Sequence, residues 1–328
     1  MSYLEEHYYE IFKPYSNEEL VRDVKSYVDG GGKLLKVLNY FFKECIYNCT
    51  NTRGRKTPIE ALQCDEDIEW ILNYVNNKPN FYKGTDTQNI ESFFRNGGRL
   101  ACKVANFPAK EARKIYFRYF PNAINNSDHQ LHILDTSSGF GSRMSAVLLS
   151  GHTYIGFDPN KQLHKKLFEC ARWYKDNGFI NDNQHCRLIC KGSETFIPDL
   201  ENTIDVSFTS PPYFNLETYS NDNSASTQNY DNYHNWLVNF VRPTIENTYR
   251  YLKVGGYAMI NIKNLTRDGK QKLFDDWYEI FCSIDGFEPY EVFEMKQSST
   301  KVVGQYANYD PKNYQNAKEP IMCFRKVY

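Results

Sequence analysis

Four consecutive residues, Ser210-Pro211-Pro212-Tyr213, combine a hydroxyl group, a rigid backbone and an aromatic ring. They follow the apolar run Ile204-Asp205-Val206-Ser207-Phe208, which is typical of a buried parallel strand. The two prolines fix the backbone and remove two N–H donors, so the strand must end there. A polar side chain and free carbonyl groups are then held at its carboxyl end, where ligands bind in open α/β sheets. This corner, followed by the ring of Phe214, suits a flat substrate with an amino group, such as a nucleobase.

The exocyclic amino group of a base is a poor nucleophile because its lone pair is delocalised into the ring. In this SPPY motif (residues 210–213), the Ser210 hydroxyl and the Pro211 carbonyl can both accept hydrogen bonds from such a group and orient it. Rigid acceptors cost little reorganisation in the transition state. Tyr213 would stack on the base, which must leave a duplex to reach the pocket, and Phe214 would pack behind it. A rigid turn that only terminates the strand is the simpler alternative.

A second candidate site is the glycine turn (residues 134–142), where a predicted strand leads into a helix. Gly139 and Gly141 permit positive φ angles and a close approach of the backbone to a ligand. Asp135 can accept hydrogen bonds or face a cation. The next predicted strand ends at Asp158, about 20 residues further on, where a carboxylate can bind both hydroxyls of a ribose. These features favour a cofactor that contains a nucleoside.

The glycine turn also limits the kind of cofactor. It lacks the full G-x-G-x-x-G spacing of dinucleotide sites, and Asp135 would repel a pyrophosphate. A nicotinamide oxidoreductase is therefore disfavoured, whereas a sulfonium cofactor has no phosphate and carries a positive charge. The simpler alternatives are a turn or N-cap role for Asp135 and a solvated strand end for Asp158.

Alternating strands and helices position both motifs. From about residue 131, strand patterns at 132–134, 154–157, 186–189, 204–208 and 257–262 are separated by helical patterns. This order predicts an α/β fold with a right-handed, mostly parallel sheet and helices on both faces, completed by a terminal antiparallel hairpin at 291–293 and 321–324. Residues 1–104 show mainly helical patterns, so we expect a helical N-terminal region followed by a second domain at 105–328.

The two motifs together resemble the S-adenosylmethionine-dependent amino methyltransferases of DNA, which methylate the exocyclic nitrogen of cytosine or adenine. The resemblance covers about residues 105–328. Its most specific part is the SPPY motif, which matches the family pattern (Asp/Asn/Ser)-Pro-Pro-(Tyr/Phe). The resemblance implies a Rossmann-like class I methyltransferase domain with a seven-stranded, mostly parallel sheet. It also implies S-adenosylmethionine as the cofactor and no metal ion.

The resemblance extends to the residues that would hold this cofactor. Asp135-x-x-x-Gly139-x-Gly141 matches the family's cofactor loop, although Ser138 and Arg143 depart from the usual alanine or glycine and from the usual small hydroxyl residue. A further cofactor motif would precede the first strand, and Gly192-Ser193-Glu194 lies where the third strand would contact adenine. The implied cofactor-binding residues are Asp135, Ser137, Gly139, Gly141, Asp158, Ser193, Asn106, Phe107 and Pro108.

Local features indicate how DNA would be recognised. A basic cluster lies within residues 95–118, and a second one comprises Arg53, Arg55 and Lys56. Phosphate contacts need such local charge, although a solvated helix face is the alternative. Two polar, aromatic loops at 216–233 and 296–318 flank the presumed pocket. We expect these loops and the N-terminal region to recognise the target, because too few residues separate Glu194 from the SPPY motif for a recognition insert.

The composition indicates in which compartment the protein works and which partners it needs. The formal net charge of −1 gives no global attraction to nucleic acid, so a partner subunit or a homodimer would assist DNA binding. Nine cysteines without a C-x-x-C pair indicate a reducing compartment. The sequence shows no signal peptide and no long apolar run. We therefore expect a soluble protein in a bacterial or phage-like cytoplasm, or another intracellular setting with access to DNA.

The substrate has several possible interpretations. Serine in the first position of the SPPY motif favours N4 of cytosine slightly over N6 of adenine. RNA is a less favoured partner than DNA, and a protein amide would also fit the same corner because the related Asn-Pro-Pro-Tyr motif acts on glutamine side chains. A catalytically silent DNA-binding subunit of the same fold is a further alternative.

Overall fold

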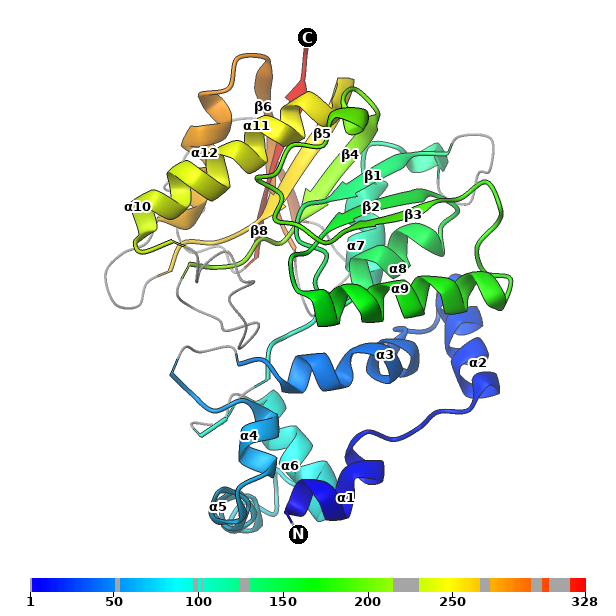
Figure 1. The fold of residues 1–328 in the computed structure, drawn as a ribbon, viewed down its shortest axis with the longest axis vertical. Coiled ribbons are helices and arrows are strands. Elements are labelled where there is room, and N and C mark those ends of the chain that lie inside the picture. The colour runs from blue at the N-terminus through cyan, green and yellow to red at the C-terminus, as the bar shows by residue number, and fades with distance from the viewer. Residues whose placement is uncertain are drawn as a thin grey trace. The chain divides into compact units, whose positions relative to one another are not determined.

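The computed structural model describes residues 2–50, 54–96, 100–101, 103–123, 130–214, 230–265, 272–295, 303–306 and 319–328. The chain divides into two compact units (Figure 1). The first comprises Met1–Asn106 with Phe214–Ala225, and the second comprises Phe107–Tyr213 with Ser226–Tyr328. The expected domain boundary between residues 104 and 105 stays a prediction.

The first unit is built from helices in its described part. They are α1 (Tyr3–Ile11), α2 (Asn17–Val28), α3 (Leu35–Tyr47), α4 (Pro58–Leu62), α5 (Asp65–Asn76) and α6 (Asp86–Arg95). Capping boxes at Ser2, Ser16, Thr57 and Thr85 satisfy backbone N–H groups at the start of α1, α2, α4 and α6. Large side chains of α3 and α6 are fully buried and form its core.

The second unit is built on an eight-stranded sheet with the order β3-β2-β1-β4-β5-β8-β6-β7. The strands are β1 (His132–Asp135), β2 (Thr153–Phe157), β3 (Cys186–Ile189), β4 (Ile204–Thr209), β5 (Leu252–Asn261), β6 (Phe287–Glu294), β7 (Val303–Tyr306) and β8 (Pro320–Lys326). Strands β1 to β5 pair in parallel, and β8 runs antiparallel to both of its neighbours, β5 and β6. The predicted sheet and its terminal antiparallel pair are confirmed, and the short strand β7 beside β6 adds an eighth strand to the seven expected.

Helices cover both faces of this sheet (Figure 1). One face carries α8 (Ser142–Leu148) and α9 (Lys161–Asp176), with α7 (Ala109–Tyr116) packed beside α8. The other carries α11 (Arg242–Tyr251) and α12 (Leu273–Cys282), preceded by α10 (Tyr233–Trp236) and the π-helical turn η4 (Leu237–Val241). Short 3₁₀ turns lie at η1 (Pro121–Ala123) and η2 (Pro198–Leu200). Strands buried on both sides explain the continuous apolar runs of the sequence.

The register of the central strands brings their carboxyl ends to one edge. In β1, Leu134 lies between Ile155 of β2 and Ser207 of β4. One residue further on, Asp135 lies opposite Gly156. Because these neighbouring strands are parallel, the glycine turn, the end of β2 and the SPPY motif all leave the sheet at the same edge.

Candidate functional site

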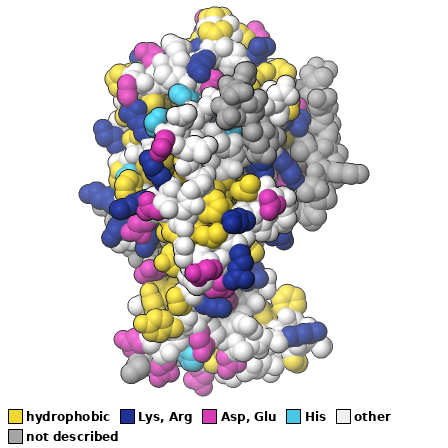
Figure 2. Space-filling model, turned by 90° about the vertical axis from the view of Figure 1, so that its right-hand side faces the viewer, with side chains coloured by type: hydrophobic (Ala, Val, Ile, Leu, Met, Phe, Trp, Pro, Cys, Tyr) yellow, Lys and Arg dark blue, Asp and Glu magenta, His cyan; other side chains and the backbone are white. Residues whose placement is uncertain are grey.

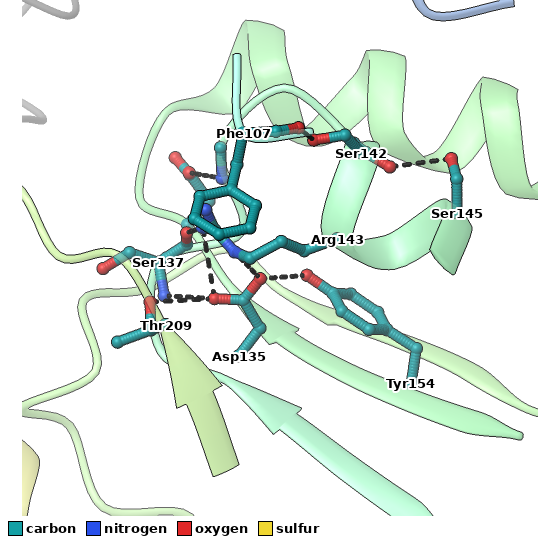
Figure 3. Close-up of polar contacts among 11 residues, drawn as sticks. Phe107, Asp135, Ser137, Ser142, Arg143, Ser145, Tyr154 and Thr209 are labelled. Carbon is teal, nitrogen blue, oxygen red and sulfur yellow. Dashed lines mark hydrogen bonds and ion pairs between the residues drawn. The ribbon is translucent and has the colours of Figure 1, made fainter. Parts of the chain in front are cut away.

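A hydrogen bond joins the strand that leads into the SPPY motif to the glycine turn. Thr209 is the last residue of β4, and its Oγ1 donates to Oδ1 of Asp135 at the end of β1, at 2.9 Å. The SPPY motif follows Thr209 directly. The structure therefore brings the rigid corner and the glycine turn together at adjacent strand ends (Figure 3).

The glycine turn has the backbone expected of it. Gly139 and Gly141 have φ angles of 57° and 73°, and α8 begins directly after Gly141. The amide of Ser138 donates to the carbonyl of Phe157 at 2.8 Å, which ties the turn to the end of β2. The turn is thus pinned to β2 while its glycines leave room for a close backbone contact.

Asp135 is fully buried and bound on all sides by donors of the protein itself (Figure 3). Arg143 donates through Nε to Oδ2 at 2.8 Å and through Nη2 to Oδ1 at 3.3 Å. Further bonds come from the Tyr154 hydroxyl at 3.0 Å and from the Ser137 amide at 3.2 Å, in addition to Thr209. Its carboxylate pairs with Arg143. A contact of Asp135 with a cofactor stays a prediction.

Arg143 was marked in the sequence only as a departure from the usual pattern. Its side chain is 7% exposed, and besides Asp135 it donates to the carbonyl of Ser137. The guanidinium also lies 5.8 Å from the centre of the Phe107 ring. Burial lowers the pKa of Arg143, but the charge and hydrogen bonds of Asp135 outweigh this effect and hold the pKa above its ordinary value. The Arg143 guanidinium therefore keeps its positive charge beside Asp135.

Tyr154 reaches Asp135 because Gly156 has no side chain. A Cβ atom at Gly156 would collide with the Tyr154 ring and with Ser138 Oγ. Burial, and next the charge of Asp135, raise the pKa of Tyr154, so its hydroxyl remains a donor. Tyr154 and Thr209 were not identified from the sequence. The only signal was Gly156, a glycine inside an otherwise apolar strand.

Asp158 lies at the end of β2, at the predicted edge of the sheet. It is half-buried, and its oxygens accept bonds from the amides of Gly139 at 3.2 Å and Asn160 at 3.0 Å. Burial raises the pKa of Asp158 to about 6, with a smaller contribution from the charge of Asp135, while the two amide bonds oppose the rise. Each oxygen keeps acceptor capacity for a further partner.

The segment after β3 holds the expected residues in an unexpected orientation. Ser193 is buried, its hydroxyl shares a hydrogen bond with Thr244 at 2.9 Å, and its carbonyl accepts from Asn247 at 3.0 Å. It therefore turns toward α11. In the next residue, Glu194, the buried Oε2 atom has no hydrogen-bond partner among the described residues, and burial raises the pKa of this carboxyl. Glu194, rather than the Ser193 side chain, offers an open acceptor.

Phe107, in the predicted upstream motif, contacts the glycine turn. The Ser142 hydroxyl donates to its carbonyl, and its ring packs edge-on against Phe208 of β4 with centroids 5.5 Å apart. Pro108 is exposed and forms the N-cap of α7. Asn106 is half-buried and is the last residue of the first unit before the division. A contact of these residues with a cofactor stays a prediction.

The SPPY motif leaves the sheet after Thr209, as predicted. Pro211 is buried, whereas Ser210, Pro212 and Tyr213 are half-buried. The Tyr213 hydroxyl accepts a hydrogen bond from the amide of Lys263, in the segment after β5, at 3.1 Å. Phe214 is buried and groups with the first unit. The ring of Tyr213 is thus fixed at both ends, by the prolines and by the neighbouring strand end.

Several residues expected to contact DNA have acidic partners. Lys56 pairs with Asp67, and this hydrogen bond and charge raise its pKa. In the cluster at 95–118, Lys114 lies 2.9 Å from Glu111, and Arg118 binds Glu291 through two nitrogens at 2.6 and 3.0 Å. On the face drawn in Figure 2, Lys and Arg side chains are interspersed with Asp and Glu. These pairs reduce the charge available to phosphates.

Other parts of the expected recognition surface cannot be placed. Arg53 lies outside the described residues, as do most of the loops at 216–233 and 296–318. Arg55 is half-buried. A role for Arg53, Arg55 and Lys56 in binding DNA therefore stays a prediction.

Within the described ranges, no group of three or more His, Cys, Asp or Glu residues could hold a metal ion. None of the helices in this part of the chain is long and apolar enough to cross a membrane.

Comparison with solved structures gives only distant similarity. An rRNA methylase from Streptococcus thermophilus is 14% identical, with 69% of this chain and 99% of that chain covered and a TM-score of 0.40. A 1,6-didemethyltoxoflavin N1-methyltransferase from Burkholderia thailandensis is 12% identical, with 67% and 78% covered and a TM-score of 0.40. An O-methyltransferase from Thermotoga maritima is 11% identical, with 69% of this chain and 68% of that chain covered and a TM-score of 0.39. No curated protein matches the chain.

A protein-family model gives a more specific result. The model, described as a DNA methylase of the N6 and N4 amino methyltransferases, matches residues 204–328. The matched segment begins with β4 and contains the SPPY motif and strands β5 to β8. Residues 204–328 of this chain are therefore similar to the N6/N4 DNA methylases.

Proposed function

We propose that this protein transfers the methyl group of S-adenosylmethionine to the exocyclic amino nitrogen of a base in DNA. The hydrogen bond between Thr209 and Asp135 carries the proposal, because it joins the strand that presents the SPPY motif to the turn suited to the methyl donor. The family match over residues 204–328 supports DNA as the substrate. When bound, S-adenosylmethionine supplies an electrophilic methyl group.

The residues at the end of β2 and after β3 fit the nucleoside part of this cofactor. Asp158 has acceptor capacity left for the ribose hydroxyls, beside the two amides that it already binds. Glu194 has a buried oxygen without a partner among the described residues, which an adenine amino group would satisfy. Gly139 and Gly141 allow the backbone to approach the rest of the cofactor, while Ser137 and Phe107 border the turn.

The SPPY motif would orient the target nitrogen. The Ser210 hydroxyl and the Pro211 carbonyl accept hydrogen bonds from the amino group and direct its lone pair toward the methyl carbon. The Tyr213 ring, held by the amide of Lys263, stacks on a base that has left the duplex. Pro212 keeps the corner rigid. Serine is a weak base, so the proton leaves the nitrogen after methyl transfer, and serine in this position favours N4 of cytosine.

The deciding experiment is incubation of the full chain with S-adenosylmethionine and duplex DNA of mixed sequence, followed by mass spectrometry of the nucleosides. We expect N4-methylcytosine or, less favoured, N6-methyladenine. Ser210→Ala should reduce the yield by about 10²-fold, the usual cost of removing one polar group that acts in the transition state. Ser283→Ala, which removes an exposed hydroxyl at the end of α12, is the matched control.

The outcome also separates the alternatives. Methylated base from the wild type and the control, but not from Ser210→Ala, supports the proposal. Cofactor binding without any modified base in DNA would overturn it in favour of an RNA or protein substrate, or of a binding subunit. Equal loss in both serine variants would show that the SPPY hydroxyl has no special role.

A further inference from the structure

The glycine turn contains an ion pair that has no opening to a ligand on its acidic side. The side chains of Asp135 and Arg143 are 0% and 7% exposed. Hydrogen bonds from Arg143, Tyr154 and Thr209 occupy both oxygens of the carboxylate (Figure 3). A ligand could reach these oxygens only by displacing a buried donor, which leaves that donor unsatisfied.

Arg143 is placed to act on the turn as well as on Asp135. The helix α8 begins directly after Gly141, which has a positive φ angle, and Arg143 is its second residue. Its guanidinium lies beneath the turn, 3.6 Å from the position that a Cβ of Gly139 would take, and also binds the Ser137 carbonyl. A positive charge thus lies directly behind the backbone that, in the proposed function, approaches the methyl donor.

The net charge at this point matters because the donor and its product differ in charge. S-Adenosylmethionine is a sulfonium cation, whereas the product S-adenosylhomocysteine is a neutral thioether of nearly the same shape. A lone carboxylate behind the turn would favour the donor over the product. At an effective dielectric constant of about 20, one uncompensated charge about 10 Å away changes the affinity for a cation roughly tenfold.

We infer that Arg143 is a specificity-determining residue that cancels the preference of Asp135 for the cationic donor over the neutral product. The inference rests on the proposed function, because it concerns the ligands of that site. The pair keeps the turn folded by bidentate hydrogen bonds, and the cost is a weaker discrimination between donor and product. The product should accordingly be a stronger inhibitor than it would be with a small hydroxyl residue at position 143.

The test compares the wild type with variants that remove one or both charges of the ion pair. Binding of both ligands is measured by isothermal titration calorimetry, with the full chain at about pH 8.5, where carboxylates are ionised. The quantity measured is the dissociation constant of S-adenosylhomocysteine divided by that of S-adenosylmethionine. Arg143→Thr leaves Asp135 uncompensated and should raise this ratio about tenfold. Asp135→Asn leaves Arg143 uncompensated and should lower it by a similar factor. The double variant should return the ratio to within about threefold of the wild type.

Arg118→Gln is the matched control, because it breaks another bidentate arginine–carboxylate pair of the same unit, the one with Glu291. It should leave the ratio unchanged. If Arg143→Thr does not fold, Asp135→Asn decides, since asparagine keeps an acceptor for Arg143.

Opposite shifts in the two single variants support the inference. Unchanged ratios, shifts in the same direction, or an equal shift in Arg118→Gln would overturn it, while the proposed function would stand. Failure of the wild type to bind either ligand would instead overturn the proposed function, and the inference with it.

Discussion

The two halves of the candidate site are stabilised in different ways. The donor side is the glycine turn, which in the proposed function binds the methyl donor. A buried ion pair and converging hydrogen bonds fix this turn from within. The acceptor side is the SPPY motif, which in the proposed function binds the base that accepts the methyl group. It is fixed by its prolines and by the hydrogen bond between Tyr213 and Lys263. Changes on the donor side should therefore affect folding, whereas changes on the acceptor side should affect the reaction with little effect on stability.

The largest expected effect is on the donor side. Arg143→Ala leaves the Asp135 carboxylate buried without its counter-charge, which should lower the free energy of unfolding by about 3–5 kcal/mol. Urea denaturation followed by circular dichroism measures this change. Arg187→Ala breaks an exposed arginine–carboxylate pair with Asp199 and should cost at most about 1 kcal/mol. Equal costs in both variants would show that the buried ion pair contributes no more to the stability of the glycine turn than an exposed one does.

A second prediction concerns pH. The ionised form of Asp158 accepts hydrogen bonds best, and its pKa is raised to about 6. Below that pH the carboxyl becomes protonated and loses acceptor capacity, so affinity for S-adenosylmethionine should fall up to about tenfold per pH unit. Above that pH the affinity should be constant. Calorimetric titration across this range, with Asp158→Asn as a variant that should show no such dependence, tests the assignment of the ribose site.

The smallest expected effect is on the acceptor side. Tyr213→Phe removes the oxygen that accepts a hydrogen bond from the amide of Lys263 but keeps the ring that we propose stacks on the base. The loss of one such hydrogen bond should lower the free energy of unfolding by only about 1 kcal/mol, while the less firmly held ring should raise KM for DNA by up to about fivefold with kcat nearly unchanged. Steady-state kinetics with labelled cofactor measure both constants. A large drop in unfolding free energy would show that this side, too, is fixed from within.

Strand positions and the ends of strands could be predicted from the sequence because they depend on local patterns. The prolines stop β4 after Thr209, and Gly139 and Gly141 adopt positive φ angles, as their residue types require. The orientation of single side chains could not be predicted. Ser193 and Glu194 are adjacent, yet one faces α11 and the other keeps an open acceptor, because both lie in a turn after β3, where no strand or helix periodicity sets the direction of a side chain.

The partners of Asp135 were beyond local patterns for a different reason. Arg143 follows it across a turn, and Tyr154 reaches it from a neighbouring strand through the space above Gly156. Such contacts depend on the register of strand pairing, which hydrophobic periodicity does not specify between two uniformly apolar strands. The eighth strand, β7, was not predicted because its four residues belong to a polar segment at the edge of the sheet, whose sequence is typical of a loop.

The position of β8 between β5 and β6 has a consequence for synthesis on the ribosome. Residues 320–326 complete the sheet, and Ile321, Met322 and Phe324 are fully buried there. While the chain is being made, β5 and β6 present open hydrogen-bonding edges until residues 320–326 leave the exit tunnel. Between the synthesis of the SPPY motif and that of β8, the sheet can therefore pair with a wrong strand, and chaperone binding would be most valuable in this interval.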